Sequence, residues 1–530
     1  MPRWIFLRAL AAIYFSAFYS LLFQIKGLIG ADGIFPARDY LAAIAHAYPA
    51  TKIWFAPTLY WISSTSHALM IITWIGLMAS VAAFINLWPR LSFFICFLCF
   101  LSFTSASGEF SNYQSDGMLL EAGFIALFFV PRGLLPGLGA LSLPSRASLF
   151  LLQWEWFRIY FESGIVKLLS GDRQWRTLTA MDEYYQNGPL PTWVGWYVEH
   201  LPHGFHAFTA AGTLILELVL VWMLFLPRCV RIICFLIVTP WEIGVIITAN
   251  YTFLNYLVLC LGFLLLDDRF LLPIIPARHR NTVAAAIKSP STADDTLPPE
   301  SANPVAEDEN RERPRRLILS TVDRHLSAIR LAFAVVMLTW IFYDTTAEML
   351  LIPFRSLPLP TSPITLLEPF RIANQYGLFA VMTNGRYEIE FQGSNDGQNW
   401  TAYPFRYKPQ ALNEAPRIYA PYQPRFDWNL WFASLGDWRQ DELVPLTEER
   451  LLENDKDVIA LFRGNPFAQS PPRFVRTVLW QYWFTSREEK RATGNWWRRQ
   501  YLGLYAPELT KSPDGRNAVV QWPEELPLHN

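Results

Sequence analysis

Four ionisable side chains lie close together within one apolar stretch, at residues 153–180 (QWEWFRIYFESGIVKLLSGDRQWRTLTA). Glu155, Arg158 and Glu162 are spaced i, i+3 and i+7, so on a helix they share one narrow face. Lys167 lies about 140° further round from Glu162, near the point where the helix should leave a bilayer. Because ionisable groups inside a membrane are costly unless they face a bundle interior or a wet cavity, the pattern indicates a functional site by default.

Glu162 and Lys167 form the candidate catalytic pair. Burial inside a membrane can lower the pKa of a lysine, and such a lysine, placed beside acids, can act as a base. In the other interpretation, Lys167 extends its ammonium group to the membrane surface, and a Glu–Arg–Glu network around Arg158 only fixes helix packing. The sequence leaves both interpretations open.

Polar residues also gather near the ends of other apolar segments. The predicted buried polar cluster consists of Glu121, Glu155, Arg158, Glu162, Lys167, Asp172, Arg176 and Asn250. Glu217 and Glu242 are isolated acids within two further apolar segments. We expect these groups to converge on an outward-facing polar cavity that the C-terminal part of the chain covers.

The sequence contains no complete set of metal ligands and no known motif for a catalytic nucleophile or a bound nucleotide. His200, His203 and His206 are spaced by three, but Pro202 and Gly204 interrupt any helix between them and no neighbouring carboxylate completes a ligand set. The sequence has no G-x-S-x-G, no Walker loop and no G-x-G-x-x-G placed between a strand and a helix. We therefore predict no metal site and no cofactor.

The elements that must position these residues are membrane helices. Of the 530 residues, 52% are hydrophobic and only 17% are charged, and the apolar residues crowd into 5–267 and 329–343. The net charge of −1 gives a nucleic-acid partner no electrostatic support. About nine segments approach the ~20 apolar residues that a bilayer requires. They lie near residues 4–23, 66–86, 91–107, 117–130, 147–168, 207–226, 232–249, 251–266 and 329–351.

Loop charges predict the sidedness of these segments. With the N-terminus inside and strict alternation over nine spans, Arg90, Arg132, Arg146, Arg228 and Arg231 all fall in or near inside loops. An odd number of spans then places the C-terminal part outside.

The predicted fold is a membrane α-helical bundle followed by a mainly β soluble C-terminal domain. We predict four parts: a helical membrane domain at 1–276, a disordered cytoplasmic linker at 277–317, a last transmembrane helix at 318–352, and a β-rich domain at 353–530 on the periplasmic or lumenal face. The linker is rich in Pro, Ser, Ala and charge and poor in bulky apolar groups.

The C-terminal domain shows clear local signals. Residues 386–392 and 400–407 alternate in polarity around the turn sequence GSNDG, which predicts a β-hairpin. Residues 427–435 read as an amphipathic helix and 473–484 as another strand. Aromatic residues of the helix, Trp428, Trp431 and Phe432, are candidates for client binding.

Several long motifs resemble the lipase maturation factor family. In the membrane part these are YSLLFQIKGLIGADGIFP, YQSDGMLLEAGF, FRIYFESGIVKLLSGDRQWRTLTAMDEYYQNGPLP and ITANYTFLNYL. In the C-terminal part they are NQYGLFAVMTNGRYEIEFQGSNDGQNW, PYQPRFDWNLWFASL and NPFAQSPPRFVR. The membrane part is also distantly similar, in architecture only, to the helical domain of vitamin K-dependent carboxylase.

The resemblance implies a polytopic membrane protein whose animal relatives reside in the endoplasmic reticulum. There they help secreted lipases to fold and assemble, and the soluble C-terminal portion contacts the client. The short flank before the first apolar segment favours a bacterial inner membrane, with the endoplasmic reticulum membrane as the counterpart in a eukaryote. The implied partners are membrane lipid and an exported client such as a lipase.

Two functions follow from these observations. The favoured one is a chaperone-like factor, not an enzyme, that assists folding, assembly or maturation of exported clients at the outer face. The alternative is a membrane enzyme that acts on a lipid or polypeptide in an outward-facing polar cavity.

Overall fold

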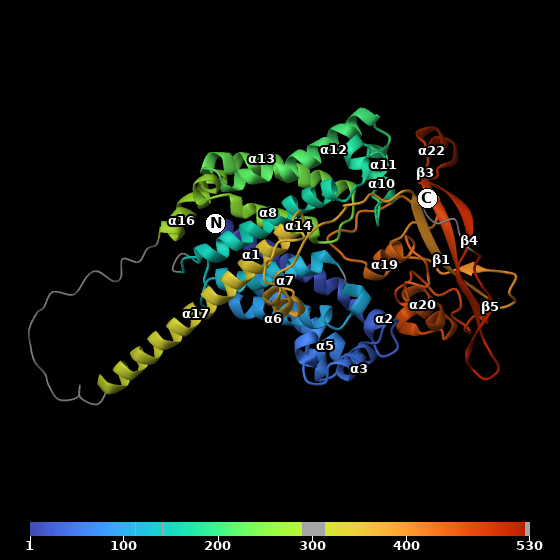
Figure 1. The fold of residues 1–530 in the computed structure, drawn as a ribbon, viewed down its shortest axis with the longest axis horizontal. Helices are drawn as coiled ribbons and strands as arrows, with labels where there is room; N and C mark the ends of the chain where they lie inside the picture. The colour runs from blue at the N-terminus through green and yellow to red at the C-terminus, as the bar shows by residue number, and fades with distance from the viewer. Residues whose placement is uncertain (112, 140–141, 289–312, 525–530) are drawn as a thin grey trace, which may run out of the picture.

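The protein has a helical part and a C-terminal part built on a sheet, which lie side by side (Figure 1). The computed structural model describes residues 1–111, 113–139, 142–288 and 313–524. The helical part extends from the N-terminus to the long helix α17 (Arg313–Leu351), and the sheet occupies the last third of the chain. The two parts share one extensive buried hydrophobic core.

Each of the nine segments predicted to span a membrane is helical. The helices are α1 (Pro2–Leu22), α5 (Ser66–Phe84), α6 (Pro89–Thr104), α7 (Gln114–Phe129), α8 (Arg146–Leu169), α12 (His203–Leu218) with η3 (Leu220–Phe225), α13 (Arg228–Thr248), α14 (Leu254–Gly262) with η4 (Phe263–Leu265), and α17. Short helices connect them: α2 (Ile25–Ile29), α3 (Ala37–Ala47), α4 (Lys52–Phe55), η1 (Leu59–Trp61), η2 (Gly108–Ser111), α9 (Arg173–Thr177), α10 (Tyr184–Asn187), α11 (Trp193–Glu199), α15 (Asp268–Leu271) and η5 (Leu272–Ile274).

The count of about nine spans is not confirmed. Within the described residues, five helices are long and apolar enough to cross a membrane, at Pro2–Leu22, Ser66–Phe84, His203–Phe225, Arg228–Thr248 and His325–Leu351. The apolar helices Pro89–Thr104 and Leu254–Leu265 are shorter. The remaining two are α7, whose 16 residues reach only about 24 Å, and α8, which carries the ionisable groups.

Helix α8 is the central element of the helical part. Its N-cap Ser145 accepts a hydrogen bond from the backbone N–H of Ser148, and the chain leaves it through Ser170 and Gly171, whose φ of +83° favours glycine. It packs against α7, α12, α14 and α17. Because neighbours surround α8, its charged residues face protein and not lipid.

Helix is present at both ends of the segment that was predicted to be a disordered linker. Residues Ala277–Lys288 form α16, and α17 begins at Arg313, so both ends of the 277–317 segment are helical. Residues 289–312 lie outside the described residues. Helix α17 projects beyond the bundle (Figure 1).

The sheet is five-stranded and antiparallel, in the order β2-β1-β3-β4-β5. The strands are β1 (Arg386–Ser394), β2 (Thr401–Ala402), β3 (Phe474–Phe484), β4 (Trp497–Lys511) and β5 (Asn517–Gln521). The predicted hairpin is confirmed by the pairing of Gln392 with Ala402, although its second strand has only two residues. Strand β3 matches the predicted strand, whereas β4 and β5 had no prediction.

Helices also contribute to the C-terminal part. They are α18 (Ser362–Leu367), η6 (Glu368–Phe370), α19 (Arg425–Ala433), α20 (Leu443–Leu452), α21 (Lys456–Ile459) and α22 (Arg487–Thr493). Helix α19 confirms the helix predicted at 427–435. Helices α19 and α20 lie between the sheet and the helical part (Figure 1), where α20 packs on β3 and β4 and α21 packs on α2.

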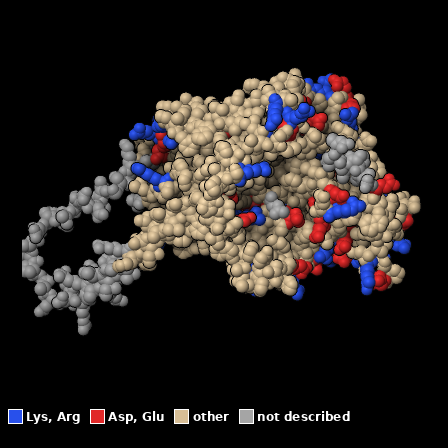
Figure 2. Space-filling view, in the orientation of Figure 1, with Lys and Arg blue, Asp and Glu red and all other residues tan. Residues whose placement is uncertain are grey.

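Charged side chains are distributed unevenly over the surface. On the face that Figure 2 shows, Lys, Arg, Asp and Glu gather over the C-terminal part and its border with the helices. Most of the helical surface on this face carries no charge, apart from a group near α16. The uncharged surface is compatible with a hydrocarbon environment, and the charged surface is compatible with water.

Candidate functional site

Arg158 lies at the centre of a closed ionic network. Its guanidinium forms an ion pair with Glu121 of α7, and its Nη1 lies 3.6 Å from Glu162 Oε1, one turn along α8. Nη1 also donates a hydrogen bond of 2.7 Å to the carbonyl oxygen of Asn374. All three charged side chains are buried. The predicted helix face thus holds Arg158 and Glu162 together and recruits Glu121 from a neighbouring helix.

A segment of the C-terminal part closes this network. The backbone N–H of Asn374 donates to Glu121 Oε2 at 3.1 Å, and the backbone N–H of Tyr376 donates to Glu162 Oε2 at 2.6 Å. Each carboxylate therefore pairs with Arg158 and accepts a backbone hydrogen bond, which offsets much of the cost of burying it, although Glu162 Oε1 and Arg158 Nε have no hydrogen-bond partner within the described residues. We interpret this network as structural.

Glu155 lies on the same helix face and is fully buried, but it does not join the network by contact. Neither of its carboxylate oxygens has a hydrogen-bond partner within the described residues. It is one turn of α8 further from the C-terminal part than Arg158. The segment that closes over Glu121 and Glu162 supplies no donor to it.

Lys167 does not pair with Glu162, so the predicted catalytic pair is not formed. The Lys167 ammonium lies 2.7 and 2.8 Å from the two carboxylate oxygens of Glu217 on α12, and it donates to Ser163 Oγ at 2.5 Å. The reason is the rotation of about 140° between the two positions, which directs Lys167 to a different neighbour of α8. Lys167 is 97% buried, so it is not a lysine extended to the membrane surface.

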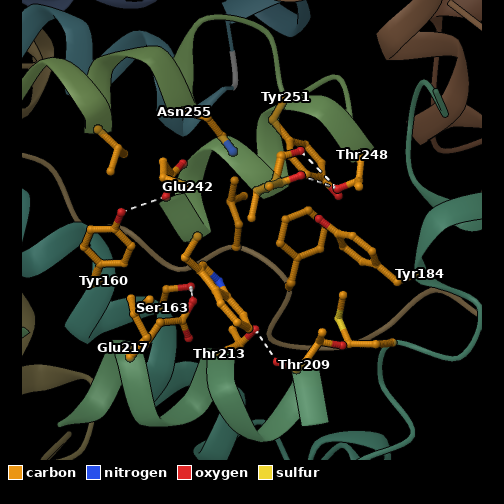
Figure 3. A pocket seen from close by; sticks show the side chains of 18 of the residues that line it. Tyr160, Ser163, Tyr184, Thr209, Thr213, Glu217, Glu242, Thr248, Tyr251 and Asn255 are labelled. Carbon is orange, nitrogen blue, oxygen red and sulfur yellow. Dashed lines mark hydrogen bonds between the residues drawn. The ribbon is translucent and has the colours of Figure 1, made fainter. Parts of the chain in front are cut away.

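The Lys167–Glu217 pair lines a cavity of about 510 Å³ between α8, α12, α13 and α14 (Figure 3). Tyr160 donates a hydrogen bond of 2.7 Å to Glu242 of α13 across the same space. The rest of the lining is mainly apolar and aromatic. It includes Trp175, Met181, Tyr184, Trp241, Tyr251 and Phe379. A mainly apolar cavity with a few polar groups is the usual form of a small-molecule site.

Glu217 and Glu242 were predicted only as isolated acids. Their partners come from α8, which is distant in the sequence, so no local spacing could identify them. The signal available in the sequence was a single acid inside an apolar segment, which requires some partner.

The remaining members of the predicted polar cluster have other roles. Asp172 caps α9 by accepting from Gln174 N at 2.8 Å and also accepts from Met382 N at 2.7 Å. Asn250 is buried and accepts from Tyr419 N at 2.7 Å. Both side chains therefore hold the C-terminal part against the helices.

Arg176 requires a correction. It was predicted to join the buried cluster, but its side chain is exposed on α9. The neighbouring Trp175 is the buried residue of this short helix and donates to the carbonyl oxygen of Phe379 at 2.9 Å. In a helix of one and a half turns, burial of Trp175 turns Arg176 outward.

A second buried ion pair joins the two parts directly. Arg425 of α19 donates to both carboxylate oxygens of Asp116 of α7, at 2.7 and 2.9 Å, and neither side chain is exposed. Such a two-point contact fixes orientation as well as distance. The helical part and the C-terminal part are therefore docked in one defined arrangement.

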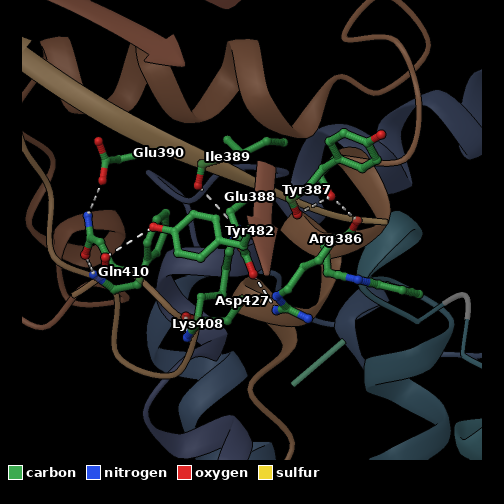
Figure 4. A network of polar contacts seen from close by, with 12 residues as sticks. Arg386, Tyr387, Glu388, Ile389, Glu390, Lys408, Gln410, Asp427 and Tyr482 are labelled. Carbon is green, nitrogen blue, oxygen red and sulfur yellow. Dashed lines mark hydrogen bonds and ion pairs between the residues drawn. The ribbon is translucent and has the colours of Figure 1, made fainter. Parts of the chain in front are cut away.

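The C-terminal part has its own buried ionic network (Figure 4). Arg386 forms an ion pair with Glu388, and Lys408 Nζ lies 2.9 Å from the same carboxylate. Arg386 also donates to the carbonyl oxygens of Gln186 and Pro189, at 2.9 and 3.1 Å. Burial lowers the pKa of Arg386, and the Glu388 carboxylate opposes that shift. This network ends on α10 and the turn that follows it in the helical part, and it strengthens the docking.

Two of the three candidate client-binding residues also belong to this interface. Trp428 packs against Tyr113 and Tyr251, with ring centroids 6.3 and 6.2 Å away, and Trp431 donates to Asn187 O at 3.1 Å. Trp428 and Trp431, named as candidates for client binding, are buried in this structure, where they are not exposed to a partner protein. Their apolar area is covered by the chain's own helices.

Phe432, the third candidate, is 47% exposed at the edge of the interface. Its ring centroid lies 6.4 Å from that of Tyr113. A single half-exposed ring beside a closed interface offers little area for a partner protein.

Comparisons with known proteins cover both parts of the chain. Residues 1–273 match the family model described as the lipase maturation factor transmembrane domain, and residues 372–507 match the lipase maturation factor C-terminal domain. The chain belongs to the lipase maturation factor family. The first match covers the helices through α15 and ends within η5, and the second covers β1 to β3, most of β4, and α19 to α22.

Individual relatives of this family member align over almost its full length. It is 30% identical to lipase maturation factor 2 of Gallus gallus, over 99% of this chain and 84% of that protein. It is 30% identical to lipase maturation factor 2 of Homo sapiens, over 96% and 83%. It is 28% identical to lipase maturation factor 1 of Bos taurus, over 99% and 92%. No solved structure gives a significant match.

Family membership and the five apolar helices together identify an integral membrane protein. The family name indicates a role in lipase maturation. In the described part of the chain, no group of three or more His, Cys, Asp or Glu side chains is placed to hold a metal ion. Of the three histidines in the spaced set, His200 lies 3.0 Å from the carbonyl oxygen of Thr485, and His203 lies 2.9 Å from Asp182.

Proposed function

We propose that this family member assists the folding, assembly or maturation of an exported lipase-class client at the outer face of its membrane. In this proposal the membrane is the bacterial inner membrane, or the endoplasmic reticulum membrane in a eukaryotic host. The C-terminal part then faces the periplasm or the lumen, as the loop arginines favour. Family membership supports a lipase as the client, and the side chains on the surface of the sheet support that surface as the site where the client binds.

The observation that carries this proposal is a strip of aromatic and arginine side chains on the sheet. We call Trp400, Arg476, Trp480, Arg499 and Tyr501 the aromatic–arginine strip. The Arg476 guanidinium lies 4.0 Å from the Trp400 ring centroid, and that of Arg499 lies 3.9 Å from the Trp480 ring centroid. The rings of Trp480 and Tyr501 are 5.2 Å apart.

The strip lies on the face of the sheet opposite α19 and α20. Thr477 of β3 donates to Glu448 of α20, so Thr477 points toward the helices. Arg476 and Trp480 are an odd number of residues from Thr477, so they point to the other face. None of the five strip residues is fully buried, and Tyr501 is 48% exposed.

The composition of the strip suits protein recognition. Trp, Tyr and Arg are the residues that most often dominate binding energy at interfaces. Stacking on the rings also holds the arginine side chains in place before a partner arrives, which reduces the entropy lost on binding. Trp428 and Trp431 cannot serve in this way because they are buried.

The test is co-expression of the full chain with a client lipase in cells that lack their own maturation factor. We expect the double variant Trp400→Ser, Tyr501→Ser to lower the yield of active secreted lipase about tenfold, since truncating an interface anchor costs about 1–2 kcal/mol or more. It should also lose capture of the lipase in pull-down from detergent extract. Unfolding temperatures of the variant and the wild type should agree.

Val520→Ser is the matched control. Val520 is 51% exposed on β5 of the same sheet but lies outside the strip, so its loss should leave the active lipase yield unchanged. A double variant that still captures lipase and still supports wild-type yield would refute the assignment of the strip. Equal losses in the double variant and in Val520→Ser would do the same.

A further inference from the structure

The cavity beside Lys167 opens sideways between two apolar helices. Phe205 of α12 and Ile237 and Pro240 of α13 all line it, and Phe205 and Ile237 are 39% and 44% exposed. Ile237 and Pro240 lie near the middle of α13, a helix long and apolar enough to span a membrane. The opening therefore extends from the first turn of α12 to the middle of α13, between two helices apolar enough to span a membrane, so a ligand can enter here from the lipid phase.

The local sequence accounts for this opening. At Gly212 an added Cβ would lie 2.7 Å from the Trp241 ring, so α12 and α13 are in close contact there. At Gly244, on the cavity wall, an added Cβ would meet no atom within 4 Å. Pro240 also lacks an N–H to bond within α13. The helices thus touch at one level and separate at another.

Polar groups inside the cavity define what kind of head group fits. Asn255 of α14 is 92% buried, has no hydrogen-bond partner within the described residues, and points into the cavity in Figure 3. Glu242 accepts a bond from Tyr160 and faces the same space. An amide offers two donors and one acceptor oxygen, and a carboxyl group can accept further bonds. These groups match hydroxyl and ester oxygens.

The charges of the lining exclude an anionic head group. Lys167 is the only Lys or Arg among the described lining residues, and Glu217 already neutralises it at 2.7 Å. Glu242 adds a second acidic group. A phosphate would meet two acidic side chains and no free cation, and it would lose its hydration in doing so.

We propose that this cavity binds a neutral membrane lipid with a hydroxyl-bearing head, of the diacylglycerol class. The lipid enters between α12 and α13. Its head group reaches Asn255 and Glu242, and an acyl chain lies along the aromatic wall of the cavity. This proposal concerns the helical part alone and does not depend on the client or on the aromatic–arginine strip.

The experiment uses the full chain in lipid nanodiscs that contain a small fraction of diacylglycerol with a photoactivatable acyl chain. We expect light-dependent labelling of peptides from α12 and α13. Unlabelled diacylglycerol should compete for the site. Phosphatidic acid with the same acyl chains should compete at least about tenfold less well, because its phosphate meets the acidic lining.

Two variants of α13 provide a matched pair. Gly244→Phe places a ring in the empty space of the cavity wall, so we expect labelling to fall about tenfold. Ile243→Phe places the same ring one residue away, at a side chain that is 47% exposed, and should leave labelling unchanged. Equal labelling of wild type and Gly244→Phe overturns the proposal, as does equal competition by phosphatidic acid.

Asn255→Leu tests the head-group site and leaves the opening between α12 and α13 unchanged. It removes the amide without adding bulk, so the preference for diacylglycerol over phosphatidic acid should fall about two- to tenfold, as expected for one or two lost hydrogen bonds. An unchanged preference overturns the assignment of the head-group site. This arm remains decisive if Gly244→Phe fails to fold.

Discussion

Arg158 and Lys167 lie about two and a half turns apart on α8, and both are buried cations with acidic partners from neighbouring helices. Arg158 is enclosed by protein, because the backbone N–H groups of Asn374 and Tyr376 donate to the two carboxylates that pair with it. Lys167 pairs with Glu217 at the wall of a cavity of about 510 Å³. The same helix thus carries a closed charge network at one level and an open one at another.

The difference between them shows how the C-terminal part shapes the membrane part. Residues 374–376 come from the segment between α17 and the sheet, and they fill the space beside Glu121 and Glu162. Beside Lys167 the same segment contributes Tyr376, Leu378 and Phe379 only as parts of the cavity wall. The Arg158 network is thus enclosed by the chain itself, whereas the neutralised Lys167–Glu217 pair borders a space large enough for a ligand.

Arg158→Met should produce the largest effect. It leaves Glu121 and Glu162 buried without their cation, so the free energy of unfolding should fall by about 3–5 kcal/mol. SDS titration in mixed micelles measures this change. Glu155→Gln is the control on the same helix face, and it should cost little because the Glu155 carboxylate has no hydrogen-bond partner in the described structure. Equal losses in the two variants would contradict a closed network around Arg158.

Asp427 extends the comparison to a carboxylate outside the membrane. It accepts hydrogen bonds from the backbone N–H groups of Tyr407 and Lys408, at 3.2 and 3.1 Å. Burial nevertheless raises the pKa of Asp427 from 3.8 to about 6. The folded chain therefore keeps this proton after the unfolded chain has released it. The contribution of Asp427 to the free energy of unfolding is fully present below pH 4. It falls by up to about 3 kcal/mol as the pH rises through 6.

Asp427→Asn removes this titration and keeps an oxygen that can accept both backbone bonds. Unfolding temperatures of the wild type and the variant at pH 4, 5, 6 and 7 measure the effect. The wild type should lose stability relative to the variant between pH 4 and 6, and the difference should be constant above pH 7. If the unfolding temperatures of the wild type and the variant change in parallel over the whole pH range, the two backbone hydrogen bonds fully offset the effect of burial on the pKa of Asp427.

Lys167→Met should cost less than Arg158→Met. It leaves Glu217 without its cation, but water in the adjoining cavity can solvate that carboxylate, so we expect a loss of about 2 kcal/mol in the same SDS titration. Lys167→Arg, which keeps the charge, should lose less than Lys167→Met. A loss as large as that of Arg158→Met would break the distinction between the closed and the open network.

Asn374→Ala should have the smallest effect. Its side-chain amide donates to Glu121 Oε2 at 3.3 Å and to Gly117 O at 3.1 Å, whereas its backbone donor to Glu121 remains after truncation. We expect a loss of about 1 kcal/mol. Gln375→Ala, at the exposed neighbouring position, should stay within about 0.5 kcal/mol of the wild type. If the two variants match, the side chain of Asn374 has no part in closing the network.

The secondary structure was largely predictable from local patterns. All nine apolar segments are helices, and the hairpin between β1 and β2 follows the alternation on either side of GSNDG. Strand β4 was not predicted, because irregular register against β3 breaks its alternation at several points. The number of spans was not predictable by composition alone, since α6, α7 and α14 are short helices that neighbouring elements can bury.

The candidate site was only partly predictable. The spacing of Arg158 and Glu162 correctly put them on one face of α8, but their shared partner Glu121 comes from α7. The aromatic composition of α19 suggested a client-binding surface, whereas Trp428 and Trp431 pack against the chain's own helices. It could not tell whether that surface meets a client or the chain's own helices, because apolar burial has no directional preference.

The sequence by itself determined which helices are apolar enough for a membrane, which face of α8 carries its charges, and that Lys167 lies on a different face. These properties depend on residue type and on the fixed period of the helix. Only the tertiary structure decided that Lys167 pairs with Glu217, that Arg425 docks on Asp116, and that one charge network is closed while the other borders a cavity. The physical reason is that ion pairs and cavities depend on how elements distant in the sequence pack together, and no local spacing encodes that packing.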